Sequence, residues 1–116
     1  MPNEDFSGGP VIRLFQVKAK PGRAPELMEK FATTSADVVH EEPGNRGYFY
    51  GKGLVSDEDY VVFASVWQDL EAVKTRFGDA WQTAFLPPGY DALIEECSIR
   101  HIDVGKGWCV ALDREQ

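Results

Sequence analysis

Segments with the two-residue period of a β-strand and segments with the helical period of about 3.6 residues alternate in the order βαββαβ along this 116-residue chain. Strands are predicted at residues 11–18, 45–54, 60–67 and 97–104, and helices at 27–39 and 70–85. This order fits the ferredoxin-like split βαβ arrangement, an antiparallel four-stranded sheet with both helices on one face. The expected fold class is therefore α+β.

Proline, glycine and one acidic residue predict where the two helices begin and end. Pro25 suits a first helical turn, and Pro43 forces the residue before it out of the helical region. Asp69 can cap the second helix, and Gly78 is expected to break or restart it. A short helical turn is expected within residues 90–96 before the last strand.

The first, third and fourth predicted strands carry apolar residues on both faces, whereas the two helices can cover only one face of the sheet. The bare face therefore needs a partner, and a second copy of the same sheet is the simplest one. The patterning predicts a homodimer.

Length and charge limit the classes of partner. The chain is long enough for one domain, predicted at residues 11–104, between a tail at 1–10 and an extension at 105–116. The net charge of −7 repels polyanions, so nucleic acid is not expected as a partner.

No membrane or secretory segment is expected either. The longest apolar run, residues 108–112, is far shorter than the roughly 18 residues that cross a bilayer. The acidic, polar N-terminus is unlike a signal peptide, which predicts a cytoplasmic protein. Cys97 and Cys109 match no paired metal or redox spacing, so both are expected to be free thiols.

Four short motifs carry a resemblance to a known family. They are residues 11–17 followed by Lys20-Pro21-Gly22-Arg23, Glu42-Pro43-Gly44 before Gly47-Tyr48, Val66-Trp67 before Asp69-Leu70-Glu71-Ala72, and the closing residues 93–104. In these stretches the chain resembles the antibiotic biosynthesis monooxygenase family, the dimeric α+β barrel proteins. The resemblance implies a barrel of two facing sheets, with a small-molecule pocket in each subunit between sheet and helices. Members of this family oxidise polycyclic phenols without metal or flavin, degrade haem or isomerise small metabolites.

Compared residue by residue, the chain keeps one of the family's pocket groups and lacks others. Trp67 matches a tryptophan that lines the pocket in the family. Phe63 and Val73 stand where the quinone-forming members have an asparagine and a tyrosine. Phe15 and Phe77 replace the strand asparagine and the iron-ligating helix histidine of the haem-degrading members. No metal and no cofactor are therefore expected.

The candidate site residues are aromatic or basic. Aromatic residues at strand and helix spacing can wall a pocket for a planar ligand or simply form the core. Arg13, which shares a strand face with Phe15, can attract an anionic substrate or make an ordinary salt bridge. His101 can be a general base or lie at a dimer edge. The aromatic candidates are Phe15, Tyr48, Tyr50, Phe63, Trp67, Phe77 and Trp81.

Together with the resemblance, these residues predict a cofactor-independent monooxygenase acting on a phenolic or quinol-like aromatic compound. Trp67 would be a wall or N–H donor, His101 the base, and Tyr48 or Tyr50 a further donor. The alternative is a non-catalytic dimeric module that binds a small hydrophobic metabolite.

Overall fold

The computed structural model describes residues 8–104, so most of the predicted tail and the whole predicted extension, with Cys109, lie outside the described residues. The strands are β1 (Val11–Ala19), β2 (Asn45–Lys52), β3 (Tyr60–Trp67) and β4 (Ile94–Asp103). The helices are α1 (Ala24–Lys30), a π-helical segment (Phe31–Ser35), α2 (Ala36–Val39) and α3 (Leu70–Phe77). Short 3₁₀ turns lie at Val55–Asp57, Gly78–Ala80 and Asp91–Leu93.

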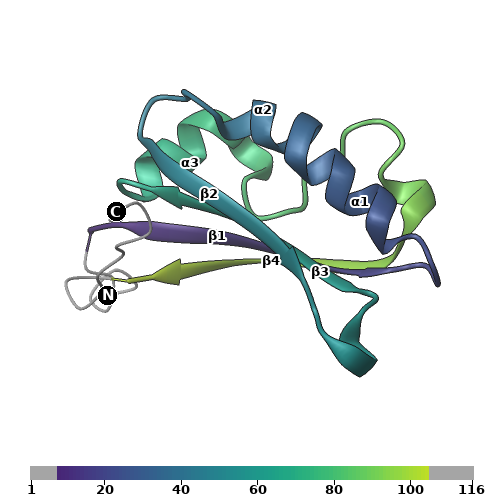
Figure 1. The fold of residues 1–116 in the computed structure, drawn as a ribbon. Coiled ribbons are helices and arrows are strands. Elements are labelled where there is room, and N and C mark those ends of the chain that lie inside the picture. Colours follow the sequence, from purple (N-terminus) through teal and green to yellow (C-terminus); the bar gives the residue numbers. More distant parts are fainter. Residues whose placement is uncertain (1–7, 105–116) are drawn as a thin grey trace.

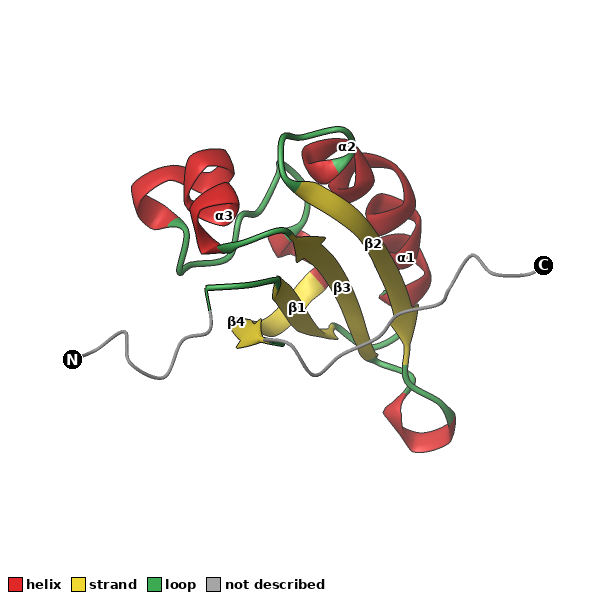
Figure 2. Ribbon diagram, turned by 90° about the vertical axis from the view of Figure 1, so that its left-hand side faces the viewer, coloured by secondary structure: helices red, strands yellow, loops and turns green. Residues whose placement is uncertain are grey.

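The four strands form one antiparallel sheet in the order β2-β3-β1-β4. All the helices lie over one face of this sheet, and the β2–β3 hairpin extends beyond it (Figures 1 and 2). This arrangement confirms the predicted ferredoxin-like α+β fold.

The first helical region runs from α1 through the π-helical segment into α2. Pro25 lies in the first turn of α1, as predicted. The backbone leaves the helix at His40, which is extended, and Glu41 adopts a positive φ of 65°. The sequence pattern predicted one helix here, but the wider π-helical turn within it has no sequence signal of its own.

The second helix is shorter than its apolar stripe suggested. Asp69 caps α3 by accepting a hydrogen bond from the Ala72 N–H (2.9 Å), as predicted. The helix ends at Phe77 because Gly78 has a φ of 72°, and only a 3₁₀ turn follows. Trp81 and Phe85, which helical spacing assigned to the same stripe, therefore lie on an irregular segment.

The two faces of the sheet differ in what covers them. On β1, the odd-numbered residues are buried beneath the helices, and the even-numbered residues point to the opposite face. That opposite face, here called the open face, carries apolar side chains that remain accessible: Phe49 is 46% and Ile102 is 41% exposed. Ile12 lies beside Ile102 on the same face.

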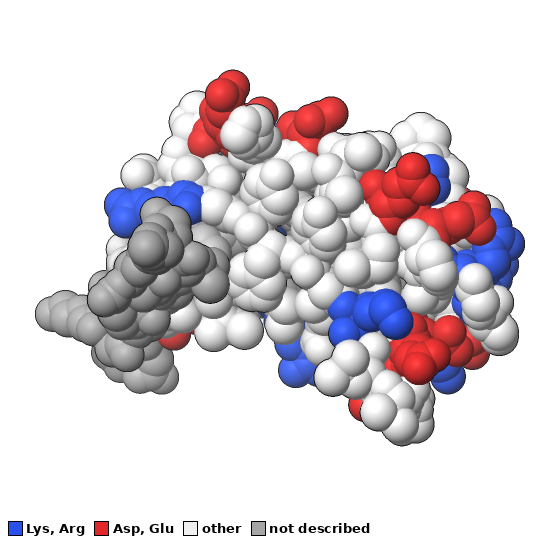
Figure 3. All heavy atoms as spheres, in the orientation of Figure 1, with Lys and Arg blue, Asp and Glu red and all other residues white. Residues whose placement is uncertain are grey.

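Charges of both signs are interspersed on the surface drawn in Figure 3, and the middle of that face is mostly uncharged. Within residues 8–104, no helix combines the length and apolar character needed to span a membrane. The absence of nucleic-acid binding stays a prediction.

Candidate functional site

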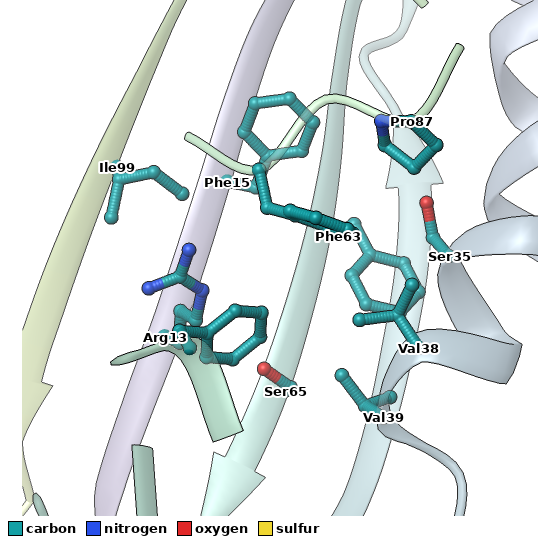
Figure 4. A pocket seen from close by; sticks show the side chains of 11 residues that line it. Arg13, Phe15, Ser35, Val38, Val39, Phe63, Ser65, Pro87 and Ile99 are labelled. Carbon is teal, nitrogen blue, oxygen red and sulfur yellow. The ribbon is translucent and has the colours of Figure 1, made fainter. Parts of the chain in front are cut away.

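A small cavity of about 40 Å³ lies between the sheet and the helices. Its walls come from the π-helical segment, α2, α3, the segment after α3 and the strands β1, β3 and β4, and most of the lining residues are apolar (Figure 4). The lining residues are Arg13, Phe15, Ser35, Val38, Val39, Phe63, Ser65, Phe77, Phe85, Pro87 and Ile99.

The strand register places the floor of the site in two adjacent rows, each with one residue from every strand. One row, here called the polar row, is Tyr48, Ser65, Arg13 and His101 in the order β2, β3, β1, β4. The next row, here called the aromatic row, is Tyr50, Phe63, Phe15 and Ile99. Both rows face the helices, because alternate residues of a strand point to the same side.

Within the aromatic row, Phe15 and Phe63 are buried, and Tyr50 at its β2 end is exposed. The rings of Tyr48 and Tyr50 stack on Phe63, with centroids 5.6 Å and 6.3 Å apart. From above, the fully buried Phe31 packs against Phe63 (5.6 Å) and Phe15 (6.0 Å). These contacts hold Phe15 and Phe63, whose flat apolar rings line the cavity and suit a planar ligand.

Arg13 places a positive charge at this cavity. It is only 5% exposed, and its guanidinium carbon lies 3.8 Å from the centroid of the Phe77 ring. Its Nη1 donates to the carbonyl oxygen of Trp81 (2.5 Å) and to Nε2 of His101 (3.1 Å), and its Nη2 donates to the carbonyl of Thr83 (3.1 Å). Burial, with a smaller contribution from Arg76, lowers the pKa of Arg13 to about 10, so it remains protonated at neutral pH.

This buried charge is not neutralised by a carboxylate within the described residues. The nearby Arg76 pairs with Glu42 (3.7 Å), whereas the recorded partners of Arg13 are two carbonyls, one imidazole and one ring. A guanidinium has five N–H groups, so Nε–H and one Nη2–H of Arg13 remain without an acceptor in this part of the chain. The cavity therefore has a positive electrostatic potential that favours an anionic ligand.

His101 lies at the end of the polar row and does not line the cavity. Its Nε2 accepts the Arg13 hydrogen bond, so the ring proton belongs on Nδ1. Burial and the neighbouring Arg13 charge lower the pKa of His101 to about 4. The predicted role of His101 as a base stays a prediction, and it requires Arg13 to release Nε2 first.

Trp67 lies beside the cavity, on the same helix-facing side of the sheet as Ser65. It is fully buried, its ring packs edge-on against Phe77 (5.9 Å), and its Nε1–H donates to the Ser65 hydroxyl (2.8 Å). Ser65 lines the cavity, and Trp67 does not. Sequence reasoning missed Ser65, although its place two residues before Trp67 puts both on the same strand face.

The cavity is closed by residues 81–90, here called the cover segment, which contains no regular helix or strand. Phe85 and Pro87 from this segment line the cavity. Arg13 holds its beginning through the Trp81 and Thr83 carbonyls. At its other end the Tyr90 hydroxyl bonds to Ser35 (2.6 Å) and donates to the Lys30 carbonyl (3.1 Å).

The predicted site residues fall into three groups. The first lines the cavity and comprises Arg13, Phe15, Phe63 and Phe77. The second lies in the two floor rows next to it and comprises Tyr48, Tyr50 and His101. The third contacts the polar row without lining the cavity and comprises Trp67, bonded to Ser65, and Trp81, whose ring centroid lies 4.9 Å from that of His101.

The lining does not fit an iron-bound haem. Axial ligation needs an imidazole, thiolate, thioether or phenolate donor, and none of the residues within 8–104 that line the cavity has one. Phe77, at the position where the resemblance implies a histidine ligand, instead lies under the Arg13 guanidinium.

Comparison with solved structures supports the fold. A protein from Shewanella oneidensis matches with a TM-score of 0.66 at 17% identity, covering 84% of this chain and 93% of that one. A haem-degrading protein from Mycobacterium tuberculosis matches at 0.61 and 22% identity, covering 88% and 99%. SnoaB, a cofactor-independent oxygenase from Streptomyces nogalater, matches at 0.60 and 17% identity, covering 81% and 91%.

At these identities the structural likeness concerns the fold alone. No curated protein gives a significant sequence match. The sequence profile described as antibiotic biosynthesis monooxygenase, however, matches residues 10–85, which is more than half of the chain. The chain therefore belongs to the antibiotic biosynthesis monooxygenase family.

Proposed function

We propose that this protein is a cofactor-independent monooxygenase whose substrate is a phenolic or quinol-like aromatic compound bound as its anion. The observation that carries the proposal is the buried Arg13 guanidinium, which faces an aromatic cavity without a carboxylate partner among the described residues. Aromatic walls select a flat ring, and the cation selects a negatively charged oxygen on it.

The Arg13 cation would also promote the reaction itself, by favouring ionisation of the bound phenol. A positive charge next to a bound phenol lowers the phenol's pKa, so the electron-rich phenolate forms near neutral pH. The phenolate can pass an electron directly to dioxygen, and the superoxide that forms is itself stabilised by the guanidinium. For a ring CH₂ group the balance is R₂CH₂ + O₂ → R₂C=O + H₂O, with the substrate as sole reductant.

Substrate entry requires the cover segment to move. With Phe85 and Pro87 in their present positions, the cavity of about 40 Å³ is narrow for a bicyclic ring. Phe85 is half exposed at the mouth, and the segment that carries it has no regular secondary structure to hold it. Outward movement of Phe85 and Pro87 would enlarge the cavity without disturbing the sheet.

Oxygen uptake tests the proposal. The protein is mixed with anthrones and naphthols, without metal or organic cofactor, and oxygen consumption and quinone formation are recorded together. We expect one quinone per oxygen consumed and at least a tenfold lower rate for Arg13→Met. Arg46→Met, at an exposed arginine of β2, is the matched control. Uptake that Arg13→Met leaves unchanged contradicts the proposed role of the cation.

The rival function is a dimeric module that binds a small hydrophobic metabolite without chemistry. One observation favours it: no histidine, tyrosine or carboxylate lines the cavity in the part of the chain that the structure describes. A substrate anion must then arrive already ionised or lose its proton to water. Tight binding of these compounds with no oxygen uptake at any pH would establish this rival instead.

A further inference from the structure

We propose that Ser65 and Arg13 together bind the single anionic oxygen of the aromatic ligand, and that Trp67 is a positioning residue that directs the Ser65 hydroxyl proton toward it. This inference rests on the proposed function and names the groups that recognise the ligand's oxygen.

The two binding groups lie next to each other by register. Arg13 on β1 and Ser65 on β3 are directly opposed cross-strand partners, and both point toward the helices. Both line the cavity, and Figure 4 shows the Ser65 hydroxyl turned to the Arg13 side of it. Directly opposed side chains lie within reach of one common small group.

The Ser65 hydroxyl has a proton without an acceptor. A serine hydroxyl has one proton and two lone pairs, and one lone pair of Ser65 already accepts the Trp67 N–H (2.8 Å). No hydrogen bond donated by Ser65 is recorded to any atom within residues 8–104. Ser65 is only 2% exposed, and an unsatisfied buried donor is costly. The cavity is therefore where its acceptor must lie.

Arg13 provides the reason why that acceptor is an anion. Nε–H and one Nη2–H lack acceptors within the described residues, and the charge lacks a carboxylate. An oxyanion next to both residues would accept a charge-assisted bond from Arg13 and a second bond from Ser65. A neutral ether oxygen at the same place would accept the bonds but would leave the charge uncompensated.

Trp67 acts through Ser65 and not on the ligand. It is fully buried, does not line the cavity, and has one polar group, whose partner is the Ser65 hydroxyl. Because an indole N–H is only a donor, Ser65 must present a lone pair to it and its proton elsewhere. Without that N–H the hydroxyl can rotate, and its proton is less often directed into the cavity.

The experiment measures the ionisation of a bound probe. 2-Naphthol absorbs at different wavelengths as the neutral phenol and as the anion, so its pKa in the complex can be read by titration. We expect binding to the wild-type protein to lower this pKa relative to free naphthol. Ser65→Ala should reduce the ionisation constant of bound naphthol about tenfold, and Trp67→Phe about threefold.

A double variant separates positioning from packing. If Trp67 acts only through Ser65, then Trp67→Phe has no further effect on naphthol ionisation in the Ser65→Ala background. An equal further loss in that background overturns the positioning role. Binding of 2-methoxynaphthalene, which has no ionisable proton, checks that each variant keeps the pocket. Ser56→Ala, at an exposed serine of the β2–β3 hairpin, is the matched control.

The outcomes distinguish this inference from the proposed function. If the wild-type protein lowers the pKa of bound naphthol and Ser65→Ala leaves that pKa unchanged, the inference is overturned and the proposed function still stands. Failure of the wild-type protein to bind naphthol, or binding with no lowering of its pKa, overturns both.

Discussion

Burying the Arg13 guanidinium costs free energy that its protein contacts recover only in part. Carbonyl oxygens and an aromatic ring replace some of the lost hydration, but no carboxylate within the described residues balances the charge. A buried guanidinium without a carboxylate partner does little to stabilise the fold, so we infer that Arg13 serves to bind a ligand. The same charge also governs its neighbour His101.

The pH dependence of stability should report on His101. Its pKa is about 4 in the folded protein, because of burial and Arg13, against 6.5 in the unfolded chain. Between pH 6.5 and 4 the unfolded chain takes up a proton that the folded protein does not, so stability is complete above pH 6.5 and falls as the pH decreases to 4. Because His101 is partly exposed, solvent screens this effect and the loss is about 1 kcal/mol.

Urea unfolding at pH 7 and pH 4.5 measures this effect in the wild-type protein and in His101→Gln, which keeps an acceptor for Arg13 but does not titrate. The variant should lose about 1 kcal/mol less than the wild type between the two pH values. His40→Gln, at an exposed histidine, is the control. If the free energy of unfolding changes with pH equally in the wild type and in His101→Gln, then His101 has the same pKa in the folded protein and in the unfolded chain.

Haem provides a second test at the level of single residues. We expect haemin to give no sharp, stoichiometric Soret shift, since Phe77 offers no lone pair to iron and no other lining residue replaces it. Weak uptake by the apolar walls is compatible with this expectation, because it leaves the iron without a protein ligand. A ligated spectrum that disappears in His101→Ala would contradict it.

Strand alternation predicted which residues share a face, but not their hydrogen-bond partners. It placed Arg13 and Phe15 together, and the structure agrees. The partner of the Trp67 N–H depends on side-chain rotamers, and the partners of Arg13 are carbonyls of a segment with no periodic pattern. Such contacts follow from tertiary packing, which a single sequence does not encode locally.

At the scale of elements, β1, β2 and β3 were predicted to within two residues of their ends, whereas β4 begins three residues earlier and α3 ends eight residues earlier than predicted. The β-branched and aromatic residues of Tyr60–Trp67 favour a strand, and no helical spacing in this stretch favours another structure. Apolar residues continue at helical spacing past Gly78 to Phe85. The positive φ of Gly78 nevertheless ends α3 at Phe77. Residues 81–85, the first half of the cover segment, were thus predicted as helix, and the role of the segment at the cavity was missed.

Removing the Arg13 side chain should loosen the cover segment. In Arg13→Met the Trp81 and Thr83 carbonyls lose their guanidinium donors, so this segment should open more often. We expect amide hydrogen exchange in residues 81–90 to become about tenfold faster, while β1 and β3 keep their protection. The Arg46→Met variant is again the control. Unchanged exchange in this segment would show that Tyr90 alone holds it.

The connection between α2 and β2 allows a clean test of packing. Gly44 has a φ of 86°, and a Cβ added there would lie 2.5 Å from the Cβ of Ala72 in α3. Gly22 has a similar φ of 77° but open space around it. Gly22→Ala should cost about 1 kcal/mol from backbone strain alone, and Gly44→Ala about 2–4 kcal/mol.

Chemical denaturation measures both substitutions, and the difference between them isolates the clash with α3. Equal losses for the two variants would show that α3 moves away without cost. The hydrogen bond from the Gln68 N–H to the Gly44 carbonyl (2.8 Å) argues against such movement, because it ties this loop to the start of α3.

For the whole molecule, the open face of the sheet predicts self-association. Phe49 and Ile102 remain exposed on it, although apolar area of this kind is usually covered. We expect light scattering after size-exclusion chromatography to give twice the 13.0 kDa chain mass. The double variant Phe49→Glu, Ile102→Glu should be a monomer, because dimerisation would then bury four carboxylates. Leu86→Glu, on the cover segment, should leave the dimer intact.

A single mass of one chain at micromolar concentration would refute the dimer. A second copy of the chain could be predicted as the partner because apolar residues on both faces of a strand can be recognised directly from the order of residues in the sequence. The size of the cavity was not predictable in that way, since it depends on how far the cover segment closes over the sheet.

The two rows on the sheet floor also determine how a scaffold of this kind can acquire a new specificity. Replacing a residue of the polar row changes the charge that the site accepts, and replacing one of the aromatic row changes the outline of the ring it accepts. Neither replacement alters the open face. Inserting one residue within a strand, by contrast, inverts the alternation and moves members of both rows to the wrong side. Ligand diversity on this sheet should therefore arise through single substitutions, one row at a time, at constant strand length.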